Sequence, residues 1–266
     1  MLDVKYGLIL ANDLTLLERV IEVSRAVAPF VDGIKIGITT ILDEGISIIK
    51  KIKDLTEIVI ADFKVADIGF WNQKKNRWEG TNAKIVEKTI NIGADYIICH
   101  SIIGISSIQE CVDIAHSLGG KVLTLPYMTH RGAELFFAHP IKPEHIYRVF
   151  EKYELNITEN EIKKCKTTTD VIILLGEKIG VDGYIGPANN FEVLERYREL
   201  TRKEIFGPGI GRQALGDVTP NEQLKKFYEI CGEKSAAIIG SAIYAAENPA
   251  EAAREFRKWR DEVVPR

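Results

Sequence analysis

Short apolar segments recur along the whole chain, and the stretches between them mix apolar and charged residues. The apolar segments are 6–11, 33–37, 58–64, 95–100, 121–126, 181–186, 204–208 and 236–240. Nearly continuous apolar runs of this length are typical of strands that are covered on both faces of a parallel sheet. We therefore predict eight buried strands.

The stretches between the predicted strands carry apolar residues at helical spacing. In 14–28, for example, Leu17, Val20, Ile21 and Val23 share one face. The other predicted helices cover 41–52, 82–92, 105–118, 131–137, 143–153, 159–164, 168–179, 190–200, 221–231 and 249–259. Strands that alternate with helices predict an α/β fold, and eight such units in about 250 residues match a (β/α)₈ barrel, the TIM barrel. An open, doubly wound sheet is the structural alternative.

Chain length, net charge, the length of the apolar runs and the cysteine spacing limit the domain number, the partners and the compartment that we expect. No linker, low-complexity tract or repeat divides the 266 residues, so we predict one domain, 1–266. A net charge of −3 gives no general reason to expect a nucleic acid or a membrane as partner. The apolar runs are far shorter than a bilayer span, and the first residues lack a signal-peptide pattern. The cysteines form no CxxC pair, which favours a reduced, cytoplasmic protein; they are Cys99, Cys111, Cys165 and Cys231.

Charged residues gather at the end of the third predicted strand. Asp62 and Lys64 project to the same side because side chains alternate along a strand, and Asp67 follows three residues later. Lys35 lies inside the second apolar strand, where an ammonium needs a carboxylate partner; Asp62 or Asp67 is the candidate. A structural ion pair at a strand end is one interpretation, and a catalytic array of carboxylates and ammonium groups is the other.

A barrel would bring the carboxyl ends of all eight strands to one face, where barrel enzymes have their active sites. The first strand ends carry charges, beginning with Asp13 and Lys35, whereas the last two carry the glycine-rich stretch 207–213 and Gly240-Ser241. Glycines allow backbone N–H groups to approach an anion, and barrels commonly bind phosphate after strands seven and eight. Each feature also has a simpler explanation: the glycines could only form a tight turn, and Asp13 could only cap the first helix.

The segment 62–68, Asp-Phe-Lys-Val-Ala-Asp-Ile, resembles the active-site signature of the archaeal-type orotidine 5′-phosphate decarboxylases. Other similar segments follow in the family's order and cover most of the chain; they are 8–13, 34–37, 128–134, 207–213 and 238–244. The resemblance implies a carbon–carbon lyase that converts orotidine 5′-monophosphate to UMP and CO₂ in pyrimidine biosynthesis. It also implies a homodimer that uses neither a cofactor nor a metal ion.

The resemblance assigns roles to the charged residues. Lys64 would donate a proton to C6 of the pyrimidine as CO₂ leaves, and Asp62 would lie beside the substrate carboxylate and hold Lys64. Lys35 and Asp13 would bind ribose hydroxyls and extend the charged array, and Lys35 would belong to the catalytic residues together with Asp62, Lys64 and Asp67. Asp67 would reach across the dimer interface into the partner's site. A C6 carbanion has no good electron sink, so its stabilisation must come from preorganised charge of this kind.

A second group of residues would bind the substrate. Thr129 would contact the amide edge of the pyrimidine, Pro208 would begin a loop that covers the phosphate, and Gln213 would bridge phosphate and base. The other expected binding positions are Ile68, Thr81, Gly209, Gly211, Arg212, Gly240 and Ser241.

The sequence departs from the family pattern in three places. Ser241 stands where the family has an arginine that grips the phosphate, and we suggest Arg212 as its substitute. The family's threonine after the signature returns only at Thr81, so 69–80 has the character of an insertion. A second insertion covers about 138–169.

Two other functions fit parts of this pattern. A phosphosugar aldolase or decarboxylase of the same superfamily uses Mg²⁺ with the aspartates, but has a glutamate where Lys35 stands, and a lysine there opposes a cation. A non-catalytic paralogue would keep the charged array and bind a ligand through an altered phosphate site, as Ser241 suggests. Stabilisation by UMP and turnover in EDTA separate these possibilities.

Overall fold

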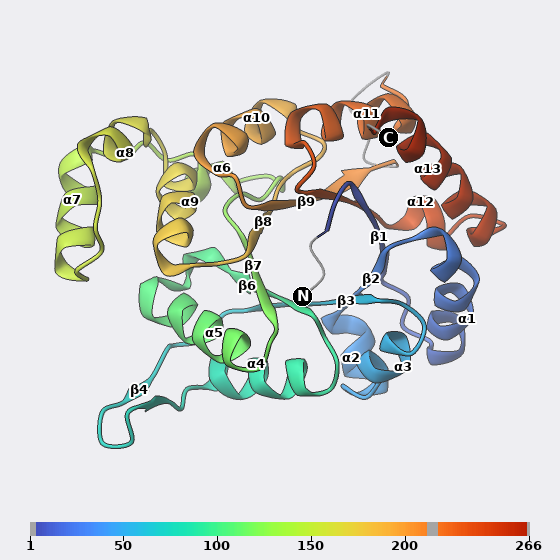
Figure 1. Ribbon diagram of the computed structural model, residues 1–266, viewed down its shortest axis with the longest axis horizontal. Coiled ribbons are helices and arrows are strands. Elements are labelled where there is room, and N and C mark those ends of the chain that lie inside the picture. The colour runs from blue at the N-terminus through green and yellow to red at the C-terminus, as the bar shows by residue number, and fades with distance from the viewer. Residues whose placement is uncertain (1–3, 212–217, 265–266) are drawn as a thin grey trace.

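The computed structural model describes residues 4–211 and 218–264, and its centre is a closed barrel of eight parallel strands (Figure 1). Each barrel strand pairs with the next along the chain, and the last pairs with the first. The barrel strands are β1 (Gly7–Asn12), β2 (Gly33–Gly37), β3 (Ile58–Val65), β6 (Tyr96–His100), β7 (Lys121–Leu125), β8 (Gly183–Ile185), β9 (Glu204–Ile210) and β10 (Ser235–Ile239). The predicted (β/α)₈ barrel is confirmed, and the open sheet is excluded.

Helices surround the barrel on its outer side (Figure 1). They are α1 (Leu17–Val27), α2 (Ile38–Glu44), α3 (Ile48–Lys53), α4 (Thr81–Asn91), α5 (Ile105–Ser117), α6 (Glu134–Phe137), α7 (Pro143–Lys152), α8 (Glu159–Lys164), α9 (Thr168–Ile179), α10 (Phe191–Leu200), α11 (Pro220–Cys231), α12 (Ser241–Tyr244) and α13 (Pro249–Val263). Single 3₁₀ turns cover Ala28–Phe30 and Ser101–Ile103. None of the helices in the described part of the chain combines the length and apolarity needed to cross a membrane.

The elements differ from the sequence prediction in a few places. The single helix predicted over 41–52 is two helices, α2 and α3, because the chain turns at Gly45 with φ 75°, a conformation that favours glycine. The short helix α12 and the two-stranded hairpin β4 (Trp71–Asn72) and β5 (Arg77–Trp78) were not predicted. Short elements of this kind carry too few residues to show a period.

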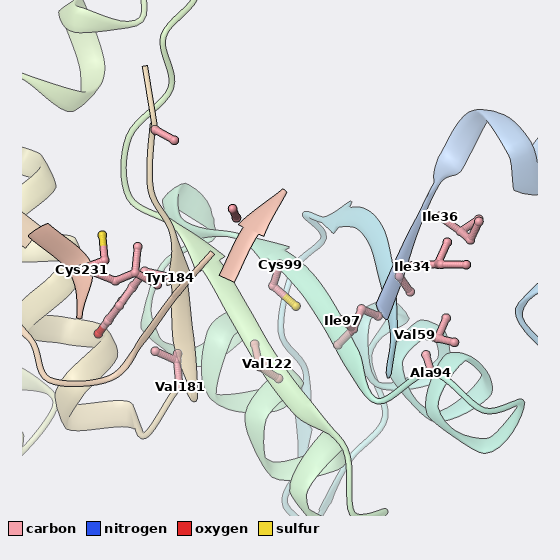
Figure 2. Close-up of a cluster of buried hydrophobic side chains, with 14 of the residues drawn as sticks. Ile34, Ile36, Val59, Ala94, Ile97, Cys99, Val122, Val181, Tyr184 and Cys231 are labelled. Carbon is pink, nitrogen blue, oxygen red and sulfur yellow. The ribbon is translucent and has the colours of Figure 1, made fainter. Parts of the chain in front are cut away.

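Alternating side chains divide the buried core into two layers. One layer fills the barrel, with Ile9, Ile60, Ile98 and Phe206 among its members. The other layer lies between the strands and the helices; Figure 2 shows part of it, including Ile34, Ile36, Val59, Ile97 and Val122. Because its neighbours on β2 belong to the outer layer, Lys35 projects into the barrel.

Polar side chains that are buried at the amino ends of the strands pair with one another inside the barrel. The Lys121 ammonium lies 3.2 Å from Oε1 of Glu204 and 3.2 Å from the hydroxyl of Tyr96, and all three residues are buried. This ion pair lies at the end of the barrel opposite the carboxyl ends of the strands, where the predicted site residues are found.

Two segments extend outward from the barrel (Figure 1). The hairpin β4–β5 lies within 69–80 and is anchored to α5: the indole Nε1 of Trp78 donates to Asp113 at 2.7 Å, and the N–H of Gly80 donates to Glu110 at 2.7 Å. The helices α7 and α8 lie within 138–169. Both segments leave the closed strand order of the barrel unchanged.

Candidate active site

A cavity of about 410 Å³ opens at the carboxyl ends of the barrel strands. Its lining brings together residues that are far apart in sequence, because they come from the ends of several different strands. The predicted site residues in the lining are Asp13, Lys35, Asp62, Lys64, Thr129, Pro208, Gly209, Gly240 and Ser241.

Asp62 is the centre of the charged half of this cavity. Its Oδ2 accepts a hydrogen bond from Nζ of Lys35 at 2.7 Å, and its Oδ1 accepts one from Nζ of Lys64 at 2.7 Å. Lys35 also forms an ion pair with Asp13, with 3.6 Å between Nζ and Oδ1. The side chains of Lys35 and Asp62 are only 8% and 11% exposed, whereas that of Lys64 is 45% exposed. Asp62 therefore links a buried ammonium to one that faces the cavity.

The electrostatic environment keeps this array ionised. Burial by itself lowers the pKa of Lys35, but the charges of Asp62 and Asp13 outweigh it and raise that pKa above its usual 10.5. Burial likewise raises the pKa of Asp62, but Lys35 and Lys64 reverse the effect and hold that pKa below 3.8. The array therefore contributes stability through the neutral range, which is lost as pH falls through the pKa of Asp62 or rises through that of Lys35.

Strand β3 becomes irregular where it carries the site. Its pairing with β6 shifts register between Ala61 and Val65, and Lys64 has φ 45°. A left-handed backbone at a residue with a Cβ atom costs about 1–2 kcal/mol, and such conformations cluster at functional sites. The irregular turn carries Lys64 at the rim while Asp62 remains in the barrel interior.

Asp67, Ile68 and Thr81 do not line this cavity. The buried amide of Asn82 holds the backbone of Asp67: its Oδ1 accepts from the N–H of Asp67 at 3.0 Å, and its Nδ2 donates to the carbonyl at 2.9 Å. The Asp67 carboxylate is exposed and accepts from the N–H of Ile68 at 2.6 Å. The side chain of Ile68 is 79% exposed. Within one chain, Asp67 therefore lies outside the ion array.

The other half of the cavity is formed by uncharged residues at the ends of β8, β9 and β10. They are Pro187, Asn189, Pro208, Gly209, Gly240 and Ser241. Ser241 is the first residue of α12 and lies at the cavity, at the position expected for a phosphate contact. The predicted binding residues Arg212 and Gln213 lie outside the described residues.

The glycines at the end of β9 do not all present their N–H groups to the cavity. Gly209 and Gly211 have φ 104° and 98°, which favours glycine at both positions. The N–H of Gly211 donates to Oε1 of Gln223 at 3.2 Å, and Gly211 is absent from the lining. Sequence reasoning missed both Gln223 and Asn189. A glutamine on the buried face of α11, four residues before Phe227, is a signal that could have revealed the first of them.

The array suits proton donation more closely than metal binding. Among residues 4–211 and 218–264, no three His, Cys, Asp or Glu side chains gather as metal ligands. The two carboxylates nearest the centre, Asp13 and Asp62, both face the ammonium of Lys35. An ammonium that is held in a fixed position can stabilise negative charge that develops beside it and then donate a proton there.

Comparisons with known proteins point to one family. The family model described as orotidine 5′-phosphate decarboxylase / HUMPS family matches residues 7–256. A relative named orotidine 5′-phosphate decarboxylase from Methanosphaera stadtmanae is 32% identical over 258 residues, which are 96% of this chain and 97% of the relative. The relative of the same name from Methanocaldococcus jannaschii is 30% identical over 252 residues, 94% of this chain and 97% of the relative.

Solved structures agree with the sequence matches. The crystal structure of orotidine 5′-monophosphate decarboxylase from Methanocaldococcus jannaschii, complexed with the inhibitor BMP, aligns with a TM-score of 0.74 at 29% identity. That alignment covers 97% of this chain and 99% of the other. The orotidine 5′-phosphate decarboxylase from Pyrococcus horikoshii aligns with a TM-score of 0.70 at 27% identity, over 96% and 99% of the two chains. The family model spans nearly the whole barrel, and this chain therefore belongs to the orotidine 5′-phosphate decarboxylase / HUMPS family.

Proposed function

We propose that this protein is a lyase that decarboxylates orotidine 5′-monophosphate to UMP and CO₂, a step of pyrimidine nucleotide synthesis. The observation that carries the proposal is Asp62, which joins Lys35 to Lys64 at 2.7 Å on each side in the cavity at the carboxyl ends of the strands. The named relatives support it, as does the inhibitor BMP in the crystal structure of the decarboxylase from Methanocaldococcus jannaschii. Lys35 favours decarboxylation over the magnesium-dependent reactions of the same superfamily, because an ammonium repels a metal cation.

In the proposed reaction, Lys64 is the proton donor. As the bond between C6 and the carboxylate breaks, its electron pair remains on C6, and CO₂ leaves. The ammonium of Lys64 stabilises that charge and transfers a proton to C6, after which solvent reprotonates the amine. Asp62 orients Lys64 throughout and lies beside the departing carboxylate. Because the array is assembled before substrate arrives, little reorganisation is needed during the reaction.

The remaining parts of the cavity would orient the nucleotide. Asp13 and Lys35 would bind the ribose hydroxyls, and Thr129 would contact the pyrimidine. The uncharged half, with Gly209 and Ser241, would receive the phosphate. Binding energy from a phosphate that is remote from C6 helps to fix the reacting carbon against Lys64.

We further propose a homodimer in which Asp67 and Ile68 complete the partner's site. In its own chain the backbone of Asp67 is held by Asn82, while its carboxylate stays exposed. The side chains of Ile68 and Phe70 are also largely exposed and lie beside it in sequence. A second copy would cover these apolar groups and bring Asp67 to the array.

A mixing experiment tests the shared site. Lys64→Ala and Asp67→Ala are each expected to lose nearly all activity as pure proteins. After subunit exchange, half of the dimers are mixed and each holds one intact site, so about a quarter of wild-type activity should return. Mixing Lys64→Ala with Lys35→Ala is the control, because these residues belong to one site and no exchange can restore it. Absence of recovery in demonstrated mixed dimers would refute the sharing of Asp67.

Arg212 is proposed to supply the phosphate-binding charge that Ser241 lacks. Arg212→Ala is expected to raise KM for orotidine 5′-monophosphate by roughly ten- to a hundredfold, because the variant loses one charge-assisted contact with the phosphate. Initial-rate kinetics measure the change in KM. Arg202→Ala, at another exposed arginine, is the control. An unchanged KM would show that the phosphate is held without this arginine.

The decisive test of the function is loss of ultraviolet absorbance when purified protein meets orotidine 5′-monophosphate, with EDTA present throughout. Turnover in EDTA supports a metal-independent decarboxylase. A folded protein without turnover would reject the function. Thermal stabilisation by UMP without turnover would then indicate the non-catalytic, ligand-binding alternative.

We assign the enzyme to the cytoplasm. All four cysteines are buried free thiols; they are Cys99, Cys111, Cys165 and Cys231. Free thiols are the rule in a reducing compartment, where disulfides are rare.

A further inference from the structure

The side chain of Gln223 is fully buried, and its amide forms one accepted and two donated hydrogen bonds, all with main-chain groups. Its Oε1 accepts from the N–H of Gly211 at 3.2 Å, and its Nε2 donates to the carbonyls of Ala188 at 3.0 Å and Gly209 at 2.8 Å. A buried amide with all of these bonds fixes two backbone segments, one at Ala188 and one at 209–211, relative to its own helix, because a bonded group that moved away would be left unpaired.

Of these three partners, Gly209 lines the uncharged half of the cavity, and Ala188 and Gly211 lie next to lining residues in the chain. Ala188 precedes the lining residue Asn189, and Gly209 is itself in the lining. The two segments also meet directly, since the N–H of Ala188 donates to the carbonyl of Pro208 at 2.9 Å. A Cβ atom at Gly209 would lie 3.2 Å from Cγ of Asn189, so the Asn189 side chain rests against this glycine. Gln223 thus joins the end of β8 to the end of β9 from behind the cavity wall.

The first turn of α11 presents Gln223 in a defined position. Thr219 and Glu222 form a capping box: the Thr219 N–H donates to Glu222 Oε2 at 2.9 Å, and the Glu222 N–H donates to Thr219 Oγ1 at 3.3 Å. Gln223 follows immediately and reaches back to Gly211, twelve residues earlier. The capped first turn of the helix therefore fixes the place from which Gln223 holds Gly211 at the end of β9.

We propose that Gln223 is a positioning residue that gives the phosphate-binding half of the site its shape. The inference rests on the proposed nucleotide substrate, but it concerns a residue outside the cavity lining. An amide is suited to the role because it offers one acceptor for Gly211 and two donors for Ala188 and Gly209. Since none of its partners belongs to the ion array, Gln223 acts on binding of the phosphate and leaves the chemistry at Lys64 unchanged.

The test compares substrates with and without phosphate in Gln223→Met, which keeps the length of the side chain but removes the amide. We expect KM for orotidine 5′-monophosphate to rise about tenfold, equivalent to about 1.4 kcal/mol, with kcat within about threefold of wild type. The kcat/KM for orotidine, which lacks the phosphate, should change far less. Gln223→Glu keeps an acceptor for Gly211 but opposes two carbonyls, and should also raise KM for the phosphorylated substrate.

Tyr228→Phe is the matched control. Tyr228 lies on the same helix, is buried, and donates to the carbonyl of Gly7 at 2.8 Å, at the amino end of β1. It should lower thermal stability without changing the preference for the phosphorylated substrate. Equal losses for both substrates in the Gln223 variants, or no loss for either, would overturn the inference. If the wild type turns over neither substrate, the proposed function fails, and the ratio of UMP to uridine dissociation constants then tests Gln223 separately.

Discussion

Lys64→Ala is expected to lower kcat/KM for orotidine 5′-monophosphate by at least about ten thousandfold. In the proposed mechanism, the variant loses the proton donor and the cation nearest the developing carbanion in one step. The protein should remain folded, because the Lys64 side chain is half exposed and Asp62 keeps its 2.7 Å contact with Lys35. Alanine also removes no buried apolar packing. Loss of absorbance at saturating and at low substrate concentration measures the effect on kcat and on kcat/KM.

Lys53→Ala is the matched control for this prediction. Lys53 also pairs with an aspartate at 2.7 Å, Asp95, but at the amino end of β6 and outside the cavity lining. Its removal should leave the kinetics unchanged. Retention of a tenth or more of wild-type activity in Lys64→Ala would show that another group supplies the proton, and would reject the role proposed for this residue.

Asp62→Asn has the second largest expected effect, because it damages both stability and activity. The substitution leaves two ammonium groups without their shared counter-charge, and Lys35 is buried. Breaking a buried ion pair on one side costs about 3–5 kcal/mol, and the nearby Asp13 should keep the loss toward the lower end. Activity should fall by about a hundred- to ten thousandfold, since Lys64 is no longer oriented. Urea unfolding and initial-rate kinetics measure the two effects.

The pH dependence of that variant provides a further check. In the wild type the lowered pKa of Asp62 means that its contribution to stability is present above pH 3.8 and disappears as pH falls through the folded-state pKa. The stability difference between wild type and Asp62→Asn should therefore shrink in acid. Asp95→Asn, which weakens a pair outside the site, should destabilise the protein and spare its activity. Equal activity losses in both variants would point to a general folding defect.

Most of the barrel could be predicted from sequence, because each strand is a compact apolar run and each helix repeats its apolar positions. The need of Lys35 for a carboxylate partner followed from its place in an apolar strand, and Asp62 was one of the two partners expected. These are local patterns, so the strands and helices can be predicted from them without knowledge of contacts between distant residues. The roles of the predicted site residues stay predictions.

What could not be predicted depends on contacts between distant segments. Gln223 reaches Ala188 across 35 residues, and nothing in the local sequence indicates which backbone groups its amide will meet. The break at Gly45 was missed because a single glycine inside a helical pattern does not by itself show that the helix ends there. The anchoring of 69–80 to α5 depends likewise on side chains from another unit of the barrel, such as Asp113.

The closure of the barrel between β1 and β10 has a consequence for synthesis of the chain. Gly7 pairs with Ala236, 229 residues later in the chain, so the first strand waits for the synthesis of β10 before its second neighbour exists. A nascent chain that has released β1 to β3 already contains the residues of the ion array, Asp13, Lys35, Asp62 and Lys64, but it lacks Ser241 and the cavity wall beside it. Such late, long-range closure is intrinsically slow. Catalytic competence should therefore arise only after translation has passed β10, and a truncated product would be inert however well its charged half had formed.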